Sequence, residues 1–212
     1  MKSIKTLKIG VILSLLFLLS QNLFAQQFIL SDDGLIDNRA KAKINEIAAE
    51  TKTKTGINVY IYAKSTLGLG ENIKGKEKFD YIKNYENQIL SSLSKPYVLL
   101  TMSVEDMHVN LLTSKGLEKI VDKDDILDGY VVPLLASKDK NTLFAKVSAS
   151  MLNGYSAIVD LISEEKKIKI ESNADIGNQG KVSSTIWRVF MYTLVVVSLL
   201  LYTFAVLRNR KK

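Results

Sequence analysis

The sequence predicts a mixed α/β fold: a mostly parallel four-stranded sheet flanked by helices as an α/β/α sandwich, with one transmembrane helix at the C-terminal end. Runs of strand length alternate with amphipathic helical stripes in the order β-α-β-α-β-β-α-α, a pattern typical of helices packed on a sheet. Residues 97–102 form an almost entirely apolar run, as expected of a central strand buried on both faces. Residues 189–207 carry no charge and are long enough to cross a bilayer.

The first half of the domain reads as two strand–helix units. Residues 28–30 are a short apolar run that ends in the acidic turn 31–34, which indicates a strand followed by a turn. Asp37 is the predicted N-cap of the next helix and Gly56 its C-terminal glycine. Residues 57–62 are β-branched and aromatic, as in a strand. The second helix is predicted from apolar residues at helical spacing that stop before Pro96, namely Phe79, Ile82, Tyr85, Ile89 and Leu93.

The second half contributes a strand pair and two helices. Residues 97–102 and 108–112 predict antiparallel neighbours because only a short turn separates them. Asp122 or Asp124 is expected to cap the following helix, which Pro133 must kink or end. The last helix carries the clearest apolar stripe, formed by Phe144, Val147, Met151, Tyr155, Ile158, Val159 and Ile162.

The N-terminal segment has the pattern of an export signal. Three lysines precede the apolar run 9–19, and Ala25 is a suitable residue at the cut. We therefore expect residues 1–25 to be a signal peptide. Leu23 is bulkier than the position three residues before the cut prefers, so an uncleaved signal anchor is the alternative.

The C-terminal segment predicts a single membrane span over 185–207, joined to the domain at 26–163 by a polar linker over 164–184. Four basic residues lie in the tail 208–212, whereas Arg188 alone precedes the uncharged stretch. The positive-inside rule places this tail in the cytoplasm. Together the two apolar segments predict a single-pass protein of the inner (cytoplasmic) membrane, with its domain facing the periplasm or exterior.

The net charge of +7 comes from basic residues in or beside the two apolar segments, not from a basic face of the domain. Eight of the 29 basic residues lie in or beside the two apolar segments, which leaves 21 basic residues against 22 acidic ones in residues 26–187. A nucleic-acid partner is therefore not expected. The chain has no cysteine, which excludes disulfides and thiolate chemistry.

Several local strings resemble the TPM domain family. They are the turn Ser31-Asp32-Asp33-Gly34-Leu35-Ile36, the pair Thr55-Gly56 before a strand, the strand pair followed by Gly116-Leu117-Glu118, and the closing helices with Gly154. The chain resembles a divergent member, because Leu93-Ser94-Lys95-Pro96 replaces the family's usual Trp-x-x-Gly and Asp-Asn-Gly strings. The resemblance implies an extracytoplasmic or lumenal, membrane-associated domain that assists membrane protein complexes. For some members it implies weak phosphatase activity or divalent-cation binding.

Two acidic clusters are candidate cation sites. Asp32 and Asp33 follow the first strand, at the sheet edge where open α/β proteins bind ligands, and Asp122 and Asp124 form a second cluster. Carboxylate oxygens suit Ca²⁺ or Mg²⁺. The alternatives are an Asx-turn beside a helix for the first cluster and helix capping for the second. His108 is the one histidine, and we interpret it as a surface residue of the hairpin.

These observations leave three functional hypotheses. The first is a non-enzymatic scaffold, or an assembly or maintenance factor, for another envelope or membrane protein. It rests on the anchor, the near-neutral domain and the lack of a recognisable catalytic motif. The second is a cation-dependent phosphatase-like enzyme that uses the acidic turns, and the third is a Ca²⁺- or Mg²⁺-binding module without turnover.

Overall fold

A four-stranded mixed sheet forms the centre of the domain. The structure is a computed structural model that describes residues 27–70, 73–173, 192–194 and 196–197. The strands are β1 (Ile29–Ser31), β2 (Asn58–Lys64), β3 (Tyr97–Ser103) and β4 (His108–Thr113), in the spatial order β1-β2-β3-β4. The first three strands are parallel, and β4 is antiparallel to β3. The predicted mixed, mostly parallel sheet is confirmed.

The register brings the ends of the three parallel strands to one edge of the sheet. Lys64 at the end of β2 pairs with Ser103 at the end of β3, and Ser103 pairs with His108 at the start of β4. Ser31 at the end of β1 pairs with Tyr62. We call this side the carboxyl edge; it comprises residues 32–34, residues 65–67 and the β3–β4 turn at 104–107. The opposite side, where β2 and β3 begin, is the amino edge.

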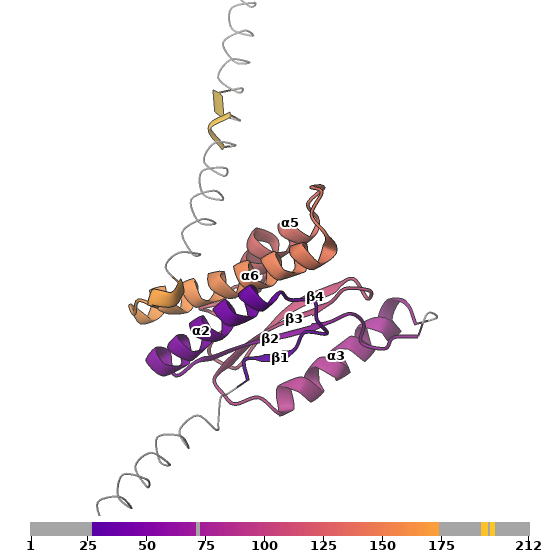
Figure 1. Cartoon of the computed structure of the whole chain (residues 1–212), viewed down its shortest axis with the longest axis horizontal. Helices are drawn as coiled ribbons and strands as arrows, with labels where there is room; N and C mark the ends of the chain where they lie inside the picture. Colours follow the sequence, from indigo (N-terminus) through magenta and orange to yellow (C-terminus); the bar gives the residue numbers. More distant parts are fainter. Residues whose placement is uncertain (1–26, 71–72, 174–191, 195, 198–212) are drawn as a thin grey trace, which may run out of the picture.

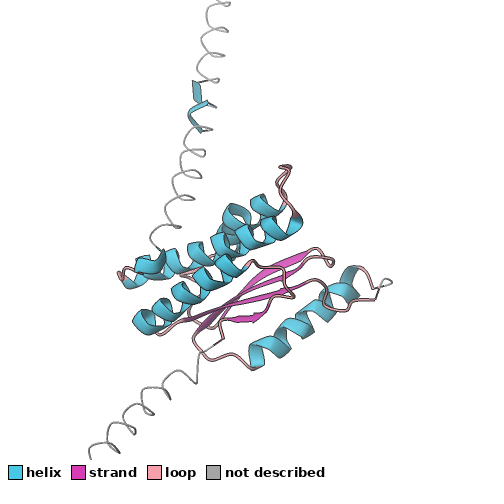
Figure 2. Ribbon diagram, in the orientation of Figure 1, coloured by secondary structure: helices cyan, strands magenta, loops and turns pink. Residues whose placement is uncertain are grey.

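Helices cover both faces of the sheet. Helix α2 (Asn38–Thr55) and helix α6 (Leu143–Lys166) lie side by side on one face, and α3 (Gly75–Ser91) alone covers the other (Figures 1 and 2). The short segments α4 (Lys123–Ile126), η1 (Leu127–Val131) and α5 (Val132–Leu135) pack against α6. Helices on both faces explain why every residue of β3 is buried.

The predicted helix signals are confirmed in detail. Asp37 accepts hydrogen bonds from the backbone of Arg39 and Ala40 at the start of α2, and Gly56 ends that helix in the left-handed conformation with φ 73°. Asp122, rather than Asp124, caps α4. Pro133 lies in the first turn of α5, directly after the π-helical turn η1, so it marks an interruption of the helix as expected.

Two residues of the predicted apolar stripes are exposed instead of buried. Phe79 is 68% exposed and Phe144 is 44% exposed. Both occupy the first turns of their helices, and Lys78 beside Phe79 contacts the β3–β4 turn. The stripe prediction was wrong at these positions, because both residues precede the first buried residue of their helix, which is Ile82 in α3 and Val147 in α6.

The folded domain extends past the predicted boundary at residue 163. Helix α6 continues to Lys166, and the chain then turns back to end in the 3₁₀ turn η2 (Glu171–Asn173). Ile170 and Asn173 are buried against the domain. The predicted linker 164–184 therefore begins too early. Its polar composition gave no sign that Ile170 is buried or that polar contacts hold this segment to the domain.

The predicted end segments fall largely outside the described residues. This applies to the signal peptide at 1–25, the linker remainder at 174–184, most of the span at 185–207 and the tail at 208–212. Among the residues that are described, no helix has both the length and the apolar character that a membrane crossing requires.

Candidate functional site

The acidic turn after β1 lies at the carboxyl edge, as predicted, and lysines neutralise it. The Asp33 carboxylate lies 3.0 Å from Lys64 Nζ at the end of β2 and accepts a hydrogen bond of 3.1 Å from the Ser65 backbone. The Lys64 contact and the Ser65 hydrogen bond hold the pKa of Asp33 below its usual value. Asp33 itself has a left-handed backbone, with φ 44°, and Gly34 continues the turn with φ 72°.

Asp32 contacts helix α2, whereas Asp33 contacts the end of β2. The Oδ2 atom of Asp32 lies 2.9 Å from Lys41 Nζ of α2. That buried oxygen makes no well-aligned hydrogen bond to the described residues. The ion pair with Lys41 therefore offsets the free-energy cost of burying it. The two neighbouring aspartates are therefore each held by a different lysine.

The second acidic cluster has a capping geometry and does not join the first. The Asp122 carboxylate accepts backbone hydrogen bonds from Asp124 and Asp125 at 2.9 and 3.0 Å. The chain reaches this cluster from Thr113, which pairs with Val98 at the amino edge. Within residues 27–70 and 73–173, no three acidic or histidine side chains gather as a metal site would require. Cation binding by Asp32, Asp33, Asp122 and Asp124 stays a prediction.

Asp106 organises the turn between β3 and β4. Its buried carboxylate accepts hydrogen bonds from the Ser103 hydroxyl and, at 2.7 Å, from the Leu67 backbone. Burial opposes ionisation of this group, but these hydrogen bonds outweigh it and lower the pKa of Asp106. Lys78 of α3 donates to the Asp106 carbonyl at 2.7 Å. These bonds tie the loop after β2, the start of α3 and the β3–β4 turn together.

A buried carboxylate lies between α3 and the sheet. Glu86 is 6% exposed and accepts hydrogen bonds from the Thr101 hydroxyl at 2.9 Å and from the Asn110 amide at 2.8 Å. The Nε2 atom of His108 lies 2.9 Å from the same carboxylate. Burial alone would raise the pKa of Glu86, but the hydrogen bonds from His108, Asn110 and Thr101 outweigh it and lower the pKa.

The interpretation of His108 as a surface hairpin residue was wrong. Its side chain is only 20% exposed and is directed toward Glu86 of α3. A histidine held by a carboxylate is the arrangement that orients imidazoles for proton transfer. Here the same contact also links α3 to β4. The hydrogen bonds from Asn110 in β4 and Thr101 in β3 to Glu86 link α3 to both strands.

Aromatic residues complete this cluster. The hydroxyls of Tyr62 in β2 and Tyr85 in α3 lie 2.6 Å apart, and burial together with this contact raises the pKa of Tyr62. A small pocket opens beside the pair, bounded by Leu67, Met102 and His108. The sequence predicts these tyrosines on core or half-buried faces, and both are half-buried. Sequence reasoning did not connect Glu86 with His108 and Asn110, which lie 22 and 24 residues further along the chain.

The domain belongs to the α/β class. Its open mixed sheet has three parallel strands and a closing hairpin, and helices cover both faces. The chain belongs to the TPM domain family, whose pattern matches residues 29–150. Among curated proteins, none matches closely enough to define a relative.

Two solved structures are similar to this chain. The N-terminal domain of a protein from P. gingivalis aligns with a TM-score of 0.51 and 12% identity, over 70% of this chain and 89% of that one. The BA42 protein from Bizionia argentinensis aligns with a TM-score of 0.41 and 16% identity, over 61% of this chain and 82% of that one. At such identity the first likeness supports the fold alone.

Proposed function

We propose that this chain is a membrane-anchored TPM domain outside the cytoplasm that binds another envelope or membrane protein as a scaffold or assembly factor. The export signal at 1–25 and the apolar stretch at 185–207 support the anchoring and the orientation. The inner membrane is the expected location, with the domain on the periplasmic or exterior side and the tail in the cytoplasm.

The observation that carries the binding role is an exposed apolar surface at the carboxyl edge. Met107 at the tip of the β3–β4 turn is 89% exposed, and Phe79 on α3 is 68% exposed. The Lys78–Asp106 hydrogen bond joins the two segments at the positions next to these residues. Large apolar side chains exposed on adjoining segments favour an interaction site, and methionine adapts well to a partner's shape.

The position of this surface suits an anchored binding domain. Helix α2 starts at the carboxyl edge after β1 and ends at the amino edge before β2. Ser172, next to the last residue that the structure describes in this part of the chain, is bound by Glu50 in the last third of α2. Residue 172 therefore lies away from the carboxyl edge, which supports the proposal that a C-terminal anchor would leave Met107 and Phe79 free for a partner.

Site-specific photo-crosslinking in intact membranes tests the proposal. A photoreactive residue at Met107 is expected to capture one reproducible membrane or envelope protein, and Phe79→Asp should reduce that capture at least about ten-fold. Thr53 is the matched control, since it is exposed near the end of α2. Equal capture from both positions, or no reproducible product from Met107, would count against the binding role. A reporter fused after residue 173 that is active only in the cytosol would refute the orientation.

A further inference from the structure

A second group of exposed apolar side chains lies where α5 meets α6. Val132 of α5 is exposed, as are Leu143 and Phe144 in the first turn of α6. Helix α5 consists of a valine, a proline and two leucines, yet none of its four residues is buried. We call Val132, Pro133, Leu143 and Phe144 the apolar corner. Exposed apolar groups of this kind favour an interaction site.

The apolar corner and α3 lie on opposite faces of the sheet. Helix α5 packs against α6, which shares one face with α2, whereas α3 alone covers the other (Figures 1 and 2). The other large exposed apolar residues within 27–70 and 73–173 are Phe79 and Tyr81 of α3 and Met107 of the β3–β4 turn. A partner bound to α3 and this turn therefore does not account for the apolar corner.

The loop between α5 and α6 places positive charge beside the apolar corner. Lys138, Asp139 and Lys140 follow one another in this loop, and all three are exposed. The Asp139 carboxylate accepts a hydrogen bond of 2.7 Å from the Ser137 hydroxyl and lies 3.5 Å from Lys146 Nζ. Because Lys146 offsets the charge of Asp139, the two loop lysines leave this region with a net positive charge.

Local hydrogen bonds hold the apolar corner in place. Lys146 of α6 donates to the Ser137 carbonyl at the end of α5. The Thr142 hydroxyl accepts a hydrogen bond of 3.2 Å from the Ala145 amide and so caps α6 directly before Leu143. The apolar side chains are therefore presented by an ordered turn, which lowers the entropic cost of binding.

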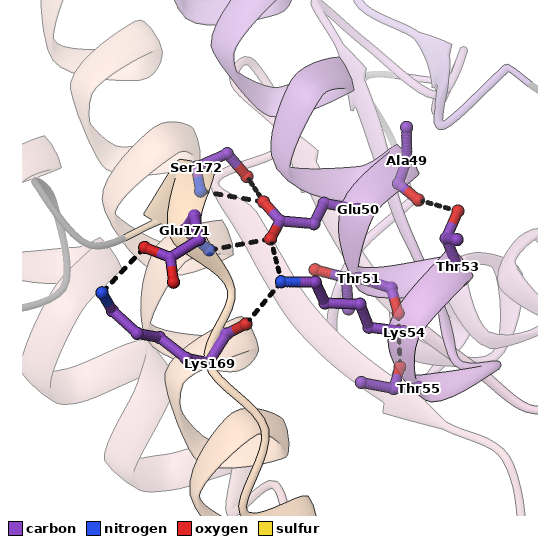
Figure 3. A network of polar contacts seen from close by, with 9 residues as sticks. All are labelled: Ala49, Glu50, Thr51, Thr53, Lys54, Thr55, Lys169, Glu171 and Ser172. Carbon is purple, nitrogen blue, oxygen red and sulfur yellow. Dashed lines mark hydrogen bonds and ion pairs between the residues drawn. The ribbon is translucent and has the colours of Figure 1, made fainter.

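The described chain after α6 lies on the same layer as the apolar corner. The Glu50 carboxylate of α2 accepts hydrogen bonds of 2.8 Å from the backbone of Glu171 and of Ser172 (Figure 3). The Asn173 amide donates to the Ser156 carbonyl of α6 at 3.0 Å. This part of the described chain, which ends at Asn173, is thus bound to the layer formed by α2 and α6.

Distances along the chain allow the apolar corner to reach the bilayer that holds the predicted anchor. The predicted span at 185–207 begins 12 residues after Asn173, which corresponds to at most about 43 Å of extended chain. Ser156 and Leu143 are 13 residues apart in α6, or about 20 Å along the helix. An anchor at the predicted span is therefore compatible with contact between the apolar corner and the same bilayer.

We propose that the apolar corner inserts into the interfacial region of this bilayer. The inference rests on the proposed membrane anchoring. Leu143 and Phe144 enter the boundary between headgroups and acyl chains, as exposed apolar side chains beside basic residues do at membrane surfaces. Lys138 and Lys140 keep their ammonium groups at the headgroups and contact the phosphates of anionic lipids. The layer of α2 and α6 then faces the bilayer, and Phe79 on α3 faces a partner.

Fluorescence quenching on the full chain in nanodiscs tests the insertion. A dye is attached at Leu143→Cys, where labelling is specific because the chain has no native cysteine. Lipids with a spin label near the headgroup should quench this dye at least about three-fold more than a dye at Phe79→Cys. Phe79 is the matched control, since it is also an exposed apolar residue in the first turn of a helix.

Substitutions separate the apolar and the charged contributions. Phe144→Asp should lower quenching at position 143 to the level of the control position, and Phe79→Asp should leave it unchanged. Discs that contain phosphatidylglycerol should give stronger quenching than phosphatidylcholine alone, and a variant with both Lys138→Gln and Lys140→Gln should lose this difference. Both phenylalanines are exposed, so these variants should fold, and circular dichroism checks that they do.

Several outcomes would overturn the inference. Equal quenching at positions 143 and 79, or quenching that Phe144→Asp does not change, would mean that the apolar corner stays in water. Equal quenching in both lipids would overturn the role of the lysines. A photoreactive residue at Leu143 that captures a protein or a second copy of this chain in place of lipid would identify a different occupant.

Flotation with the nanodisc lipids separates this inference from the proposed function. A chain that does not float with lipid would overturn the membrane anchoring and the insertion together. A chain that floats but shows no selective quenching at position 143 would overturn the insertion alone. Capture of a protein at Met107 reports on the partner role independently of both results.

Discussion

Gly154 is expected to be required for packing of α6 against η1 and β3, and alanine at this position should destabilise the domain. A Cβ at this position would lie 2.5 Å from Val131 Cγ2 and 3.2 Å from Leu100 Cδ2. Favourable carbon contacts begin near 3.5 Å. Val131 is fully buried and β-branched, so its methyl group has little freedom to move aside.

The expected magnitude follows from two opposing terms. Overpacking a close-packed core costs about 1–3 kcal/mol, and a contact of 2.5 Å to a stiff neighbour places this case at the upper end. Replacing a glycine inside a helix with alanine gains about 1 kcal/mol. Gly154→Ala should therefore lower the free energy of unfolding by about 1–2 kcal/mol.

Gly129→Ala is the matched control for this prediction. Gly129 lies in η1, and a Cβ there meets no atom within 4 Å. Its substitution should leave stability unchanged or raise it by up to about 1 kcal/mol. Urea unfolding of the full chain, read by pulse proteolysis, measures both variants. In a Val131→Ala background, the methyl group that Gly154→Ala adds should be tolerated. The double variant should therefore be less destabilised than the sum of the two single variants. A stabilising Gly154→Ala, or additive effects in the cycle, would refute the packing argument.

Three further predictions concern charged groups. Glu86→Ala should destabilise the domain by about 2–4 kcal/mol, because His108, Asn110 and Thr101 lose their acceptor. Glu77→Ala is the control, because Glu77 is exposed on the same helix. Equal unfolding curves for the two variants would contradict the prediction. The Glu50 hydrogen bonds lower its pKa from 4.5 to about 2, so their stabilisation is fully present above pH 4.5 and is lost as the pH falls toward 2. The protection factors of the Glu171 and Ser172 amides, which correct for the pH dependence of intrinsic exchange, should therefore fall across that acidic range, and in Glu50→Gln this fall should be absent. Because Lys64 already neutralises Asp33, calorimetry should show tighter Ca²⁺ or Mg²⁺ binding in Lys64→Met than in the native chain. Micromolar binding to the native chain that disappears in Asp33→Asn would instead favour the cation-binding alternative.

Features with local signals were predictable from the sequence. Asp37 bonds to amides two and three residues ahead, and Asp122 caps α4 in the same way. The strands of the sheet follow from apolar runs whose burial requires helices on both faces. The ordered segment 168–173 was missed because its attachment to Glu50 joins residues 121 and 122 positions apart (Figure 3). No local pattern distinguishes Glu50 from the other charged residues on α2, so the segment after residue 163 reads as linker.

Glu86 is a different case, because a signal for it was present. It stands four residues after Ile82 and three before Ile89, within the apolar stripe of α3 rather than on its charged face. His108 and Asn110 are two residues apart in β4, so they share one face of that strand. An ionisable residue inside an apolar stripe must bring its own hydrogen-bond partners into the interface. A polar pair on one face of a predicted strand supplies them, and this combination predicts a helix held to its sheet by a buried polar cluster.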